Sequence, residues 1–303
     1  MRIAVSGSSG LIGTALVAAF EGDGHQVTRL VRGDAGATAA GPGRLRWDPS
    51  AGTIDAAGLE GHDAVVHLAG VGIGDHKWTP AQKAAILDSR VQGTSLLATT
   101  LAGLERPPAV LASASAVGFY GDRGAQPLTE TDGAGAGFLA DVVRQWEDAT
   151  EPAAKAGIRV ARLRSGVVLT DKGGALDKQL LAFKMGVGGR IGSGEQYLSW
   201  ISLDDEVAAI RHVLTTDTIE GPVNLTAPAP VTNAEFTRAL GKVLGRPTVL
   251  PVPKLALNTM FGKEMVAEML LAGQRVLPAV LQATGFTFAD VEIEAALRRI
   301  LGK

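Results

Sequence analysis

Short apolar runs alternate with longer amphipathic stretches over the first half of the chain. Helices are predicted at about residues 80–103 and 138–156, where apolar positions recur at helical spacing. Continuous apolar runs are typical of strands buried on both faces, and their alternation with helices is typical of a doubly wound parallel sheet. The pattern therefore predicts an α/β fold. Its strands are expected at Met1–Val5, Gln26–Val31, Arg44–Trp47, Ala64–Leu68, Pro108–Ser113 and Ile158–Leu163.

Two helix starts can be located from their capping residues. Thr79 offers an N-cap, Pro80 suits the first helical position and Gln82 completes a capping box. A second start is predicted at residues 202–205 (SLDD), where the two aspartates, Asp204 and Asp205, are interpreted as caps rather than catalysts.

The pattern changes after about residue 170. Glycines are frequent at 186–194, and from about residue 232 mostly short helices are predicted, broken by a proline-rich turn at 250–254. We expect a first domain at residues 1–170, to which the chain returns around 200–226, and a smaller, mostly helical lobe at 171–303 with a helical C-terminal domain from about residue 250. Ligands of doubly wound sheets bind at the carboxyl ends of the strands, so this lobe is predicted to form a substrate pocket there.

The segment SGSSGLIG at residues 6–13 places a glycine at every third position between the first predicted strand and a helix. Glycines at such a turn let backbone N–H groups approach a pyrophosphate, and the helix N-terminus adds partial positive charge. The alternative is a tight turn without a ligand. Because the motif lies in the first βα unit, we favour a Rossmann-like dinucleotide site. Its predicted residues are Gly7, Ser8, Ser9, Gly10, Leu11, Ile12 and Gly13.

The end of the second predicted strand indicates which dinucleotide is bound. An acidic residue there would bind the ribose 2′-hydroxyl of NAD, whereas Arg32 follows this strand. A guanidinium suits a 2′-phosphate, and we therefore predict NADP(H) as the cofactor. The alternative is an ordinary surface arginine, and Asp34, two residues later, is the main argument against the prediction.

Composition narrows the setting of this site. The 303 residues are 46 % hydrophobic and 20 % charged, which is sufficient for a large core. The absence of cysteine excludes disulfides, thiolate metal sites and a cysteine nucleophile, and fits a cytoplasmic protein. A formal net charge of −2 gives no electrostatic case for nucleic acid or an anionic membrane, and five scattered histidines show no zinc spacing. We expect a small-molecule ligand and no metal, while the oligomeric state cannot be predicted.

The chain resembles the extended short-chain dehydrogenases/reductases. Its glycine-rich segment is similar to their nucleotide loop, DAVVHLAG at 63–70 to their fourth strand, and SASAVGFYG at 113–121 to the strand that carries their catalytic serine. The resemblance implies that Leu68, Ala69, Gly70, Ser113 and Gly166 also lie at the cofactor.

A closer likeness is to an atypical branch of these proteins, labelled epimerase-family, nucleoside-diphosphate-sugar-epimerase-like or cell-division-inhibitor-like. The likeness covers nearly the whole chain, including a C-terminal domain of unknown role. The segments that carry it are DSRVQGT at 88–94, LRSGVVL at 163–169, GGRIGSGEQYLSWISLDD at 188–205 and AGQRVLPAVLQATGF at 272–286.

The chain departs from this family at the residues that carry its chemistry. Fully active members have Tyr-x-x-x-Lys at the start of the helix after the fifth strand, where the tyrosine transfers a proton and the lysine lowers the tyrosine pKa and holds the ribose. When Glu147 is placed in register on that helix, Leu139 and Val143 occupy the two positions. We therefore expect the usual proton relay to be missing and these side chains to belong to a buried stripe.

Two residues could still carry chemistry. Ser115 occupies the position of the family's serine and could hydrogen-bond a substrate carbonyl or hydroxyl, or it could only cap the strand end. Tyr120 lies at the mouth of the same strand and could act as a relocated acid or base. Its alternative is a ring that packs under the loop with its hydroxyl in water.

Further candidates flank the cofactor and the expected pocket. Arg90 is expected to be half-buried against the sheet, where an arginine needs an anion or a carbonyl partner. It is interpreted either as a cofactor or substrate contact or as a member of a structural ion pair. Gln196, Tyr197 and Trp200 are candidates for substrate binding, although a core role suits Trp200 equally well.

These observations support two hypotheses. The first is an NADP-dependent oxidoreductase or epimerase that acts on a small polar compound, such as a nucleotide sugar. The second is a non-catalytic NADPH-binding redox sensor or regulatory module whose catalytic pair has been lost. The missing Tyr and Lys favour the sensor. Ser115, Arg90 and the second glycine-rich stretch, GGRIGSGEQ at 188–196, favour the enzyme, which is the hypothesis we prefer.

Overall fold

The computed structural model describes residues 1–32 and 43–303. Its centre is an eight-stranded sheet in the order β12-β8-β6-β5-β1-β2-β3-β4, parallel except between β3 and β4. The chain extends outward from β1 in both directions, so the predicted doubly wound sheet is confirmed. Its strands are β1 (Arg2–Ser6), β2 (Gln26–Val31), β3 (Arg44–Asp48), β4 (Thr53–Ile54), β5 (Ala64–His67), β6 (Val110–Ala116), β8 (Arg159–Ser165) and β12 (Gly221–Leu225).

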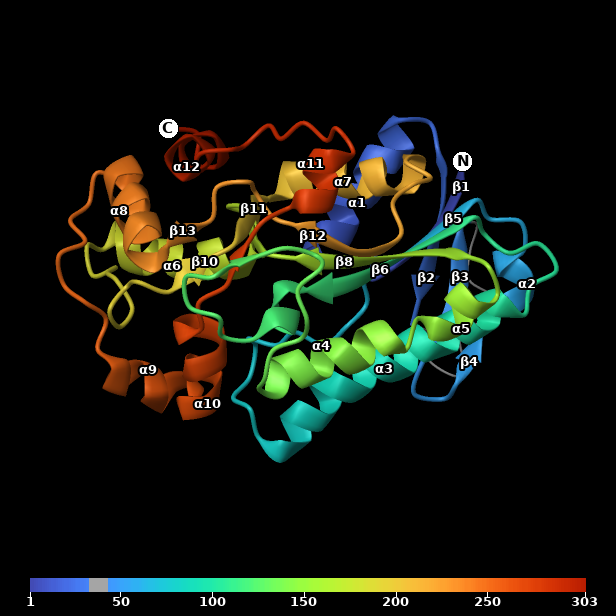
Figure 1. Ribbon diagram of the computed structural model, residues 1–303, viewed down its shortest axis with the longest axis horizontal. Helices are drawn as coiled ribbons and strands as arrows, with labels where there is room; N and C mark the ends of the chain where they lie inside the picture. Colours follow the sequence, from blue (N-terminus) through green and yellow to red (C-terminus); the bar gives the residue numbers. More distant parts are fainter. Residues whose placement is uncertain (33–42) are drawn as a thin grey trace.

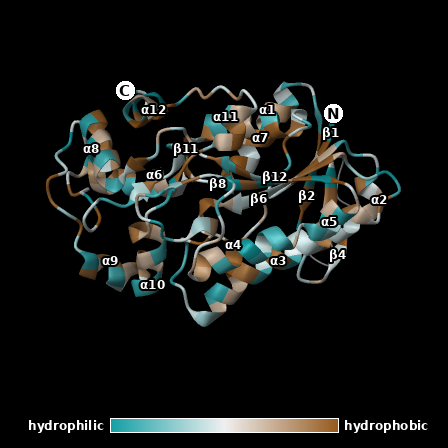
Figure 2. Cartoon of the chain, in the orientation of Figure 1, coloured by the Kyte–Doolittle hydropathy of each residue, from teal (hydrophilic) through white to brown (hydrophobic). Residues whose placement is uncertain are grey.

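Helices cover both faces of this sheet. Figure 1 shows α3, α4 and α5 on one face and α1, α7 and α11 on the other. Figure 2 shows β1 and β2, which lie between the two layers, mostly in the brown of apolar residues, as expected for strands covered on both sides. The helices are α1 (Leu11–Gly22), α2 (Ala56–Leu59), α3 (Pro80–Ala102), α4 (Phe138–Asp148), α5 (Glu151–Lys155), α7 (Leu203–Thr215) and α11 (Ala279–Ala283).

A second group of elements lies beyond the carboxyl ends of the strands, on the left in Figure 1. Its helices are α6 (Gly174–Lys184), α8 (Asn233–Leu244), α9 (Lys254–Phe261), α10 (Lys263–Met265), the π-helix η2 (Val266–Leu271) and α12 (Ile293–Ile300). Short connecting elements are the 3₁₀ turn η1 (Val117–Tyr120) and the strands β7 (Pro127–Leu128), β9 (Val167–Leu169), β10 (Tyr197–Leu198), β11 (Trp200–Ser202), β13 (Val231–Thr232) and β14 (Arg275–Val276).

The two groups of elements have separate apolar cores. Val5, Phe20 and Ile210 belong to the core between the sheet and α1 and α7, whereas Leu180 and Phe236 belong to the core of the second group. The chain passes between the groups more than once, because β12 joins the main sheet and Leu281 of α11 joins the main core. The division at residue 170 remains a prediction.

The helix predicted at 138–156 is interrupted, and that part of the prediction is wrong. It forms α4 and α5, with a break at Ala149 and Thr150. Pro152, in the first turn of α5, has no N–H to continue the α4 hydrogen-bond pattern. Thr150 instead closes the end of α4, since both its N–H and its hydroxyl donate to the Glu147 carbonyl, at 3.1 and 2.6 Å.

The two predicted helix starts are confirmed in position but not in every capping contact. The Thr79 hydroxyl accepts from Gln82 N–H at 3.1 Å, but the Thr79 N–H donates to the Lys77 carbonyl at 2.9 Å rather than to the Gln82 side chain, so only half of the capping box forms. The cap of α7 is Ser202 and not the aspartates that follow it. The Asp205 carboxylate instead accepts from Ala289 and Asp290 N–H, which attaches the C-terminal segment to α7.

Candidate functional site

The glycine-rich segment is a tight turn that joins β1 to α1. Gly7 has a φ of +66°, and a Cβ there would lie 2.7 Å from the Leu68 carbonyl carbon. A Cβ at Gly13 would lie only 2.2 Å from the Gly7 oxygen, so the third glycine lets the helix approach the turn. Gly10 is the N-cap residue of α1, without a side chain to cover the first N–H groups. The N-terminus of α1 therefore remains available to an anion.

The turn forms one side of a groove of about 400 Å³ at the carboxyl ends of β1, β2 and β5. Predicted cofactor residues from three separate segments meet here, together with Trp47, which the sequence analysis missed. Leu11, Ile12 and Gly13 do not line the groove but form the first turn of α1 behind it. The lining residues are Gly7, Ser8, Ser9, Gly10, Leu30, Val31, Arg32, Trp47, Leu68, Ala69 and Gly70.

A second groove, of about 420 Å³, adjoins the first at Ser8 and Ser9, which line both. Arg29 and Arg44 also line it, and they are direct neighbours across β2 and β3. Arg29 is paired with Glu21 at 2.8 Å, whereas Arg44 is exposed. Arg32 is exposed as well and lines the first groove, so each of the two grooves that share Ser8 and Ser9 is lined by arginine. Asp34, the residue that argued against NADP(H), lies outside the described residues.

Arg90 stabilises the loop after β5. Its Nη1 donates to the Val71 and Ile86 carbonyls at 2.9 and 3.1 Å, and its guanidinium lies over the Trp146 ring at 4.9 Å. Burial lowers the Arg90 pKa to about 10, so it stays charged at neutral pH. Its partners among the described residues are carbonyls and a ring, so the predicted ion pair does not form. The guanidinium borders Gly70, where a Cβ would lie 3.4 Å from it.

A series of buried hydrogen bonds joins the ends of β1 and β5, which border the groove, to α3 and α4. His67 Nδ1 lies 2.6 Å from the Ser6 hydroxyl, and His67 Nε2 lies 3.0 Å from the Thr94 hydroxyl. Trp146 Nε1 donates to the same Thr94 hydroxyl at 2.9 Å. Burial lowers the His67 pKa to about 4, so the ring is neutral. The end of β5 is thereby joined to α3 and α4 by uncharged contacts.

The start of α4 carries apolar side chains at the two positions, Leu139 and Val143, where the resemblance led us to look for tyrosine and lysine. Val143 is buried and Leu139 half-buried, and both face Gly118, where a Cβ would lie 3.6 Å from Leu139 and 3.8 Å from Val143. Gly137 offers no side-chain cap, and the Glu268 carboxylate from η2 accepts from the Phe138 and Leu139 N–H groups at 2.9 and 2.8 Å. Helix α4 contains neither a tyrosine nor a lysine.

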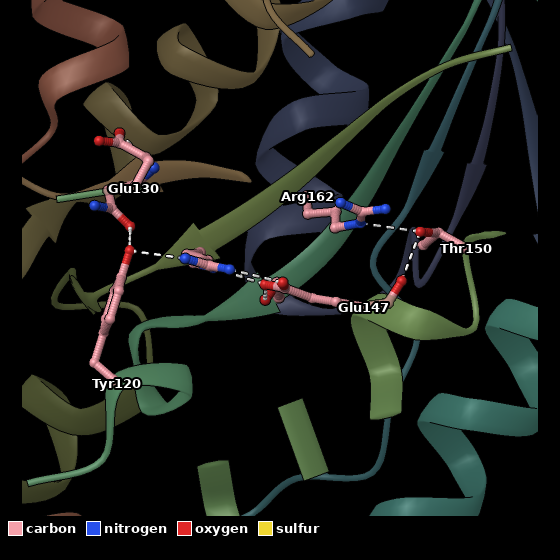
Figure 3. A network of polar contacts seen from close by, with 8 residues as sticks. Tyr120, Glu130, Glu147, Thr150 and Arg162 are labelled. Carbon is pink, nitrogen blue, oxygen red and sulfur yellow. Dashed lines mark hydrogen bonds and ion pairs between the residues drawn. The ribbon is translucent and has the colours of Figure 1, made fainter. Parts of the chain in front are cut away.

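Ser115 lies at the carboxyl end of β6, beside Glu147. Figure 3 shows Glu147 and Tyr120 in the buried network of polar side chains to which Ser115 belongs. Its hydroxyl donates to Glu147 Oε1 at 2.6 Å. Arg164 binds the same carboxylate with two nitrogens, at 2.7 and 2.8 Å. Burial alone would lower the Arg164 pKa, but the hydrogen bonds and charge of Glu147 raise it above its usual value. Ser115 is thus fixed by a buried ion pair rather than serving only as a strand cap.

Tyr120 belongs to the same network and is fully buried. Its hydroxyl donates to Asn224 Oδ1 at 2.7 Å and accepts from Arg164 Nη1 at 2.9 Å, and burial raises its pKa. The hydroxyl therefore neither faces water nor offers a free proton. The interpretation of Tyr120 as a relocated acid or base is not supported by this arrangement, because its proton is held inside the protein.

The sequence analysis missed Arg164, Asn224 and Glu268, and used Glu147 only to set a register. One local signal was available, because Glu147 lies four residues after Val143 and a charged residue on a buried helix face needs a partner. The other residues have no local signal, since Asn224 is 104 residues from Tyr120 and Glu268 is 129 residues from Leu139.

Ser113 and Gly166 lie near the network. Ser113 is buried on β6, and its hydroxyl has no hydrogen-bond partner among the described residues. A Cβ at Gly166 would lie 2.6 Å from the Ser199 carbonyl oxygen, so glycine is required there for close backbone contact. Their roles at a cofactor remain predictions.

The predicted substrate residues do not form one cluster. Trp200 is fully buried in the second core, and its Nε1 donates to the Ala229 carbonyl at 3.1 Å, so the prediction that it lines a pocket is wrong. Gln196 Nε2 donates to the Ile191 and Leu270 carbonyls at 3.0 and 2.9 Å. Tyr197 is half-buried beneath the Arg275 guanidinium. Gln196 thus joins the glycine-rich stretch at 186–194, through Ile191, to η2.

Residues 1–32 and 43–303 contain no group of three or more His, Cys, Asp or Glu side chains that could hold a metal ion. No helix in this part of the chain combines the length and apolar character needed to cross a membrane.

Comparison with known proteins assigns both ends of the chain to families. Residues 3–138 match the NAD dependent epimerase/dehydratase family, and residues 252–300 match a domain of unknown function, DUF1731. An epimerase family protein of Mycobacterium bovis is 45 % identical over 295 residues, which cover 97 % of this chain and 96 % of that protein.

Two solved structures have the same fold over the whole chain. The crystal structure of human epimerase family protein SDR39U1 (isoform 2) with NADPH has a TM-score of 0.90 and 35 % identity, and each chain is covered completely. The nucleoside-diphosphate sugar epimerase from Corynebacterium glutamicum has a TM-score of 0.81 and 38 % identity, over 100 % of this chain and 58 % of that one.

Proposed function

Because the chain belongs to the epimerase family, we propose that it binds NADP(H) in the groove beside the glycine-rich turn. The open N-terminus of α1 and the glycines around it suit a pyrophosphate, since a Cβ at Gly10 would already lie 3.3 Å from the Gly7 oxygen. The presence of NADPH in the human relative's crystal structure supports the same cofactor.

The observation that carries the choice of NADP(H) over NAD(H) is the position of Arg32. It lines the groove directly after β2, where an NAD-binding protein would have its acidic residue. Arg44 and the Ser8–Ser9 turn border the adjoining groove and extend the polar surface available to a 2′-phosphate. Titration of the protein with NADPH and with NADH, followed by nicotinamide fluorescence, measures the two affinities and tests the assignment. Equal affinities would contradict the phosphate site, and no binding of either would contradict the whole proposal.

We further propose an oxidoreductase or epimerase that acts on a small polar substrate, such as a nucleotide sugar. Bound NADP(H) would carry the hydride, given by NADPH to a carbonyl or taken by NADP⁺ from an alcohol. Ser115 would hold the reacting oxygen of the substrate, and Arg90 would keep the loop after β5 in place beside the cofactor. Without Tyr and Lys on α4, no described side chain there provides the usual proton, so we expect slow turnover.

The second candidate is a sensor that binds NADPH without turnover. It is favoured by the apolar start of α4 and by the internal hydrogen bonds of the Tyr120 hydroxyl. Oxidation of NADPH by a panel of carbonyl compounds and reduction of NADP⁺ by the matching alcohols, each with wild type and Ser115→Ala, separate the two. Turnover that depends on Ser115 supports the enzyme. Tight NADPH binding with no turnover of any compound supports the sensor.

A further inference from the structure

The hydroxyl hydrogen of Ser115 forms a hydrogen bond inside the protein, to Glu147. Ser115 Oγ lies 2.6 Å from Glu147 Oε1, and both residues are buried, with 5 % and 8 % of their surfaces exposed. A serine hydroxyl has one hydrogen to donate and two lone pairs to accept with. If that hydrogen points to Glu147, only lone pairs remain for a ligand.

Glu147 can only accept in this arrangement. Arg164 donates to both carboxylate oxygens, from Nε at 2.7 Å and from Nη2 at 2.8 Å. A guanidinium stays charged in proteins and has no acceptor atom, so a buried one requires an anion beside it. The carboxylate is therefore ionised, and an ionised carboxylate offers no hydrogen to Ser115.

The hydrogen bonds between Arg164, Tyr120 and Asn224 also have fixed donors and acceptors. Its Nη1 donates to the Tyr120 hydroxyl at 2.9 Å, and Tyr120 in turn donates to Asn224 Oδ1 at 2.7 Å. The Asn224 amide nitrogen donates to the Leu277 carbonyl at 3.0 Å. Figure 3 shows Tyr120 and Glu147 at opposite ends of the central contacts. Every hydrogen bond in this series leads away from Arg164, and none can reverse unless another is lost.

We propose that Ser115 acts toward its ligand as a hydrogen-bond acceptor, with Glu147 as the positioning residue that imposes this role. The group held against Ser115 is then a donor, which makes the substrate class an alcohol rather than a ketone or aldehyde. This inference rests on the proposed function, because it names the substrate of the same site. It also narrows the sequence-based expectation, which left both a carbonyl and a hydroxyl open.

Neutron diffraction from deuterium-exchanged crystals of the full chain tests the hydrogen position directly. We expect a deuteron on Ser115 Oγ that points to Glu147, and none on either oxygen of Glu147. A deuteron on Ser115 that points away from Glu147, or one on the carboxylate, would overturn the inference. This result does not depend on whether the protein is catalytic.

Matched small ligands test the consequence for binding. Propan-2-ol and acetone differ at the oxygen that would meet Ser115, and saturation-transfer NMR on the NADP⁺-loaded protein compares their affinities. We expect wild type to prefer the alcohol by about 3- to 10-fold, the contribution of one neutral hydrogen bond. Ser115→Ala should bring the ratio close to one without changing NADPH affinity. Equal affinities in wild type, or binding of neither ligand, would overturn the alcohol assignment.

Glu147→Gln offers a sharper result, because a glutamine amide can donate to Ser115 and release the serine hydrogen toward the ligand. The preference should then shift toward acetone. This variant leaves Arg164 buried without a counter-charge and is expected to lose stability, so Ser115→Ala carries the test if the Glu147→Gln protein does not fold. A folded Glu147→Gln protein that still prefers the alcohol would contradict the positioning role.

Ser165→Ala is the matched control. Ser165 also donates to a buried glutamate, Glu206, at 2.6 Å, but it pairs with Ala116 and so points to the opposite face of the sheet from Ser115. It should leave the alcohol preference unchanged. A wild-type protein that binds no NADPH would contradict the proposed function, whereas the deuteron position would still decide the inference about Ser115.

Discussion

The carboxylate of Glu268 accepts a hydrogen bond of 2.8 Å from the backbone N–H of Leu139. Leu139 is the residue that the sequence analysis placed at the family's tyrosine position, and Glu268 belongs to the C-terminal domain. The first N–H groups of a helix have no partner within the helix, and α4 has no side-chain cap of its own. The C-terminal domain therefore completes the helix that borders the candidate site.

Glu268→Ala should lower the free energy of unfolding by about 0.5–2 kcal/mol, the usual effect of removing a helix cap. Urea unfolding measures this difference. Glu264→Ala is the control, because Glu264 is a nearby acidic residue whose contact is an exposed ion pair with Lys83 at 2.6 Å, and such pairs contribute little. Equal losses in the two variants would show that the cap has no special importance.

Arg32→Ala should weaken NADPH binding by about 10- to 150-fold, because a hydrogen bond to a charged group contributes about 1.5–3 kcal/mol. NADH binding should change little, since NADH has no 2′-phosphate. Fluorescence titration with both cofactors measures the two affinities. Arg246→Ala removes another exposed arginine, in the loop after α8, and should change neither. Equal losses for NADPH and NADH in Arg32→Ala would refute the phosphate contact.

Valine substitutions at two glycines of the turn should have different effects, one on folding and the other on cofactor binding. Gly13→Val should give little folded protein, because a Cβ there would lie 2.2 Å from a backbone oxygen. Gly10→Val should fold but lose NADPH, since its side chain would occupy the space of the pyrophosphate. Gly22→Ala, with nothing within 4 Å of the added Cβ, is the control. Thermal denaturation and NADPH titration distinguish these outcomes, and normal affinity in Gly10→Val would leave the turn without a ligand role.

Glu206 should make the protein less stable as the pH rises. Burial raises its pKa from 4.5 to about 7, and its one hydrogen bond, from Ser165, does not offset this. Between these values the folded chain keeps a proton that the unfolded chain has lost. The free energy of unfolding therefore falls by up to about 1.4 kcal/mol per pH unit, or about 3 kcal/mol in all. Glu206→Gln should remove this dependence.

His67 acts in the opposite direction over part of the same range. Its pKa is lowered by burial from 6.5 to about 4, so its contribution to stability is present above pH 6.5 and is lost as the pH falls toward 4. Urea unfolding of wild type and Glu206→Gln at pH 5 and pH 7 separates the two effects, because His67 is common to both proteins. If the difference between the two proteins is the same at both pH values, the assignment to Glu206 is wrong.

Local patterns were sufficient to predict the sheet and the turn. The strand Gln26–Val31 has the predicted bounds, and the glycine spacing predicted a turn that the Gly7 and Gly13 contacts explain. These features depend on neighbouring residues in the chain. The predicted helix at 138–156 failed for an equally local reason, since the effect of Pro152 was overlooked.

The candidate site was harder to predict because its contacts join distant segments. Ser115 meets Glu147 across 32 residues, and no local pattern indicates which glutamate it meets. The sequence indicated Trp200 as a candidate for substrate binding because it is an aromatic residue beside the glycine-rich stretch at 186–194, although a core role suited it equally well. Its indole instead packs in the second core, which α6 and α8 complete.

The contact between Glu268 and α4 also has a consequence for synthesis on the ribosome. The N-terminal half emerges first, yet the cap of α4, and the strand β14 that pairs with β7, are translated more than a hundred residues later. The sheet can assemble while the chain grows, but the first N–H groups of α4 gain their cap only after residue 268 has been translated. The start of α4 therefore receives its final contacts later than the nucleotide-binding turn, whose close contacts all come from residues 7–69.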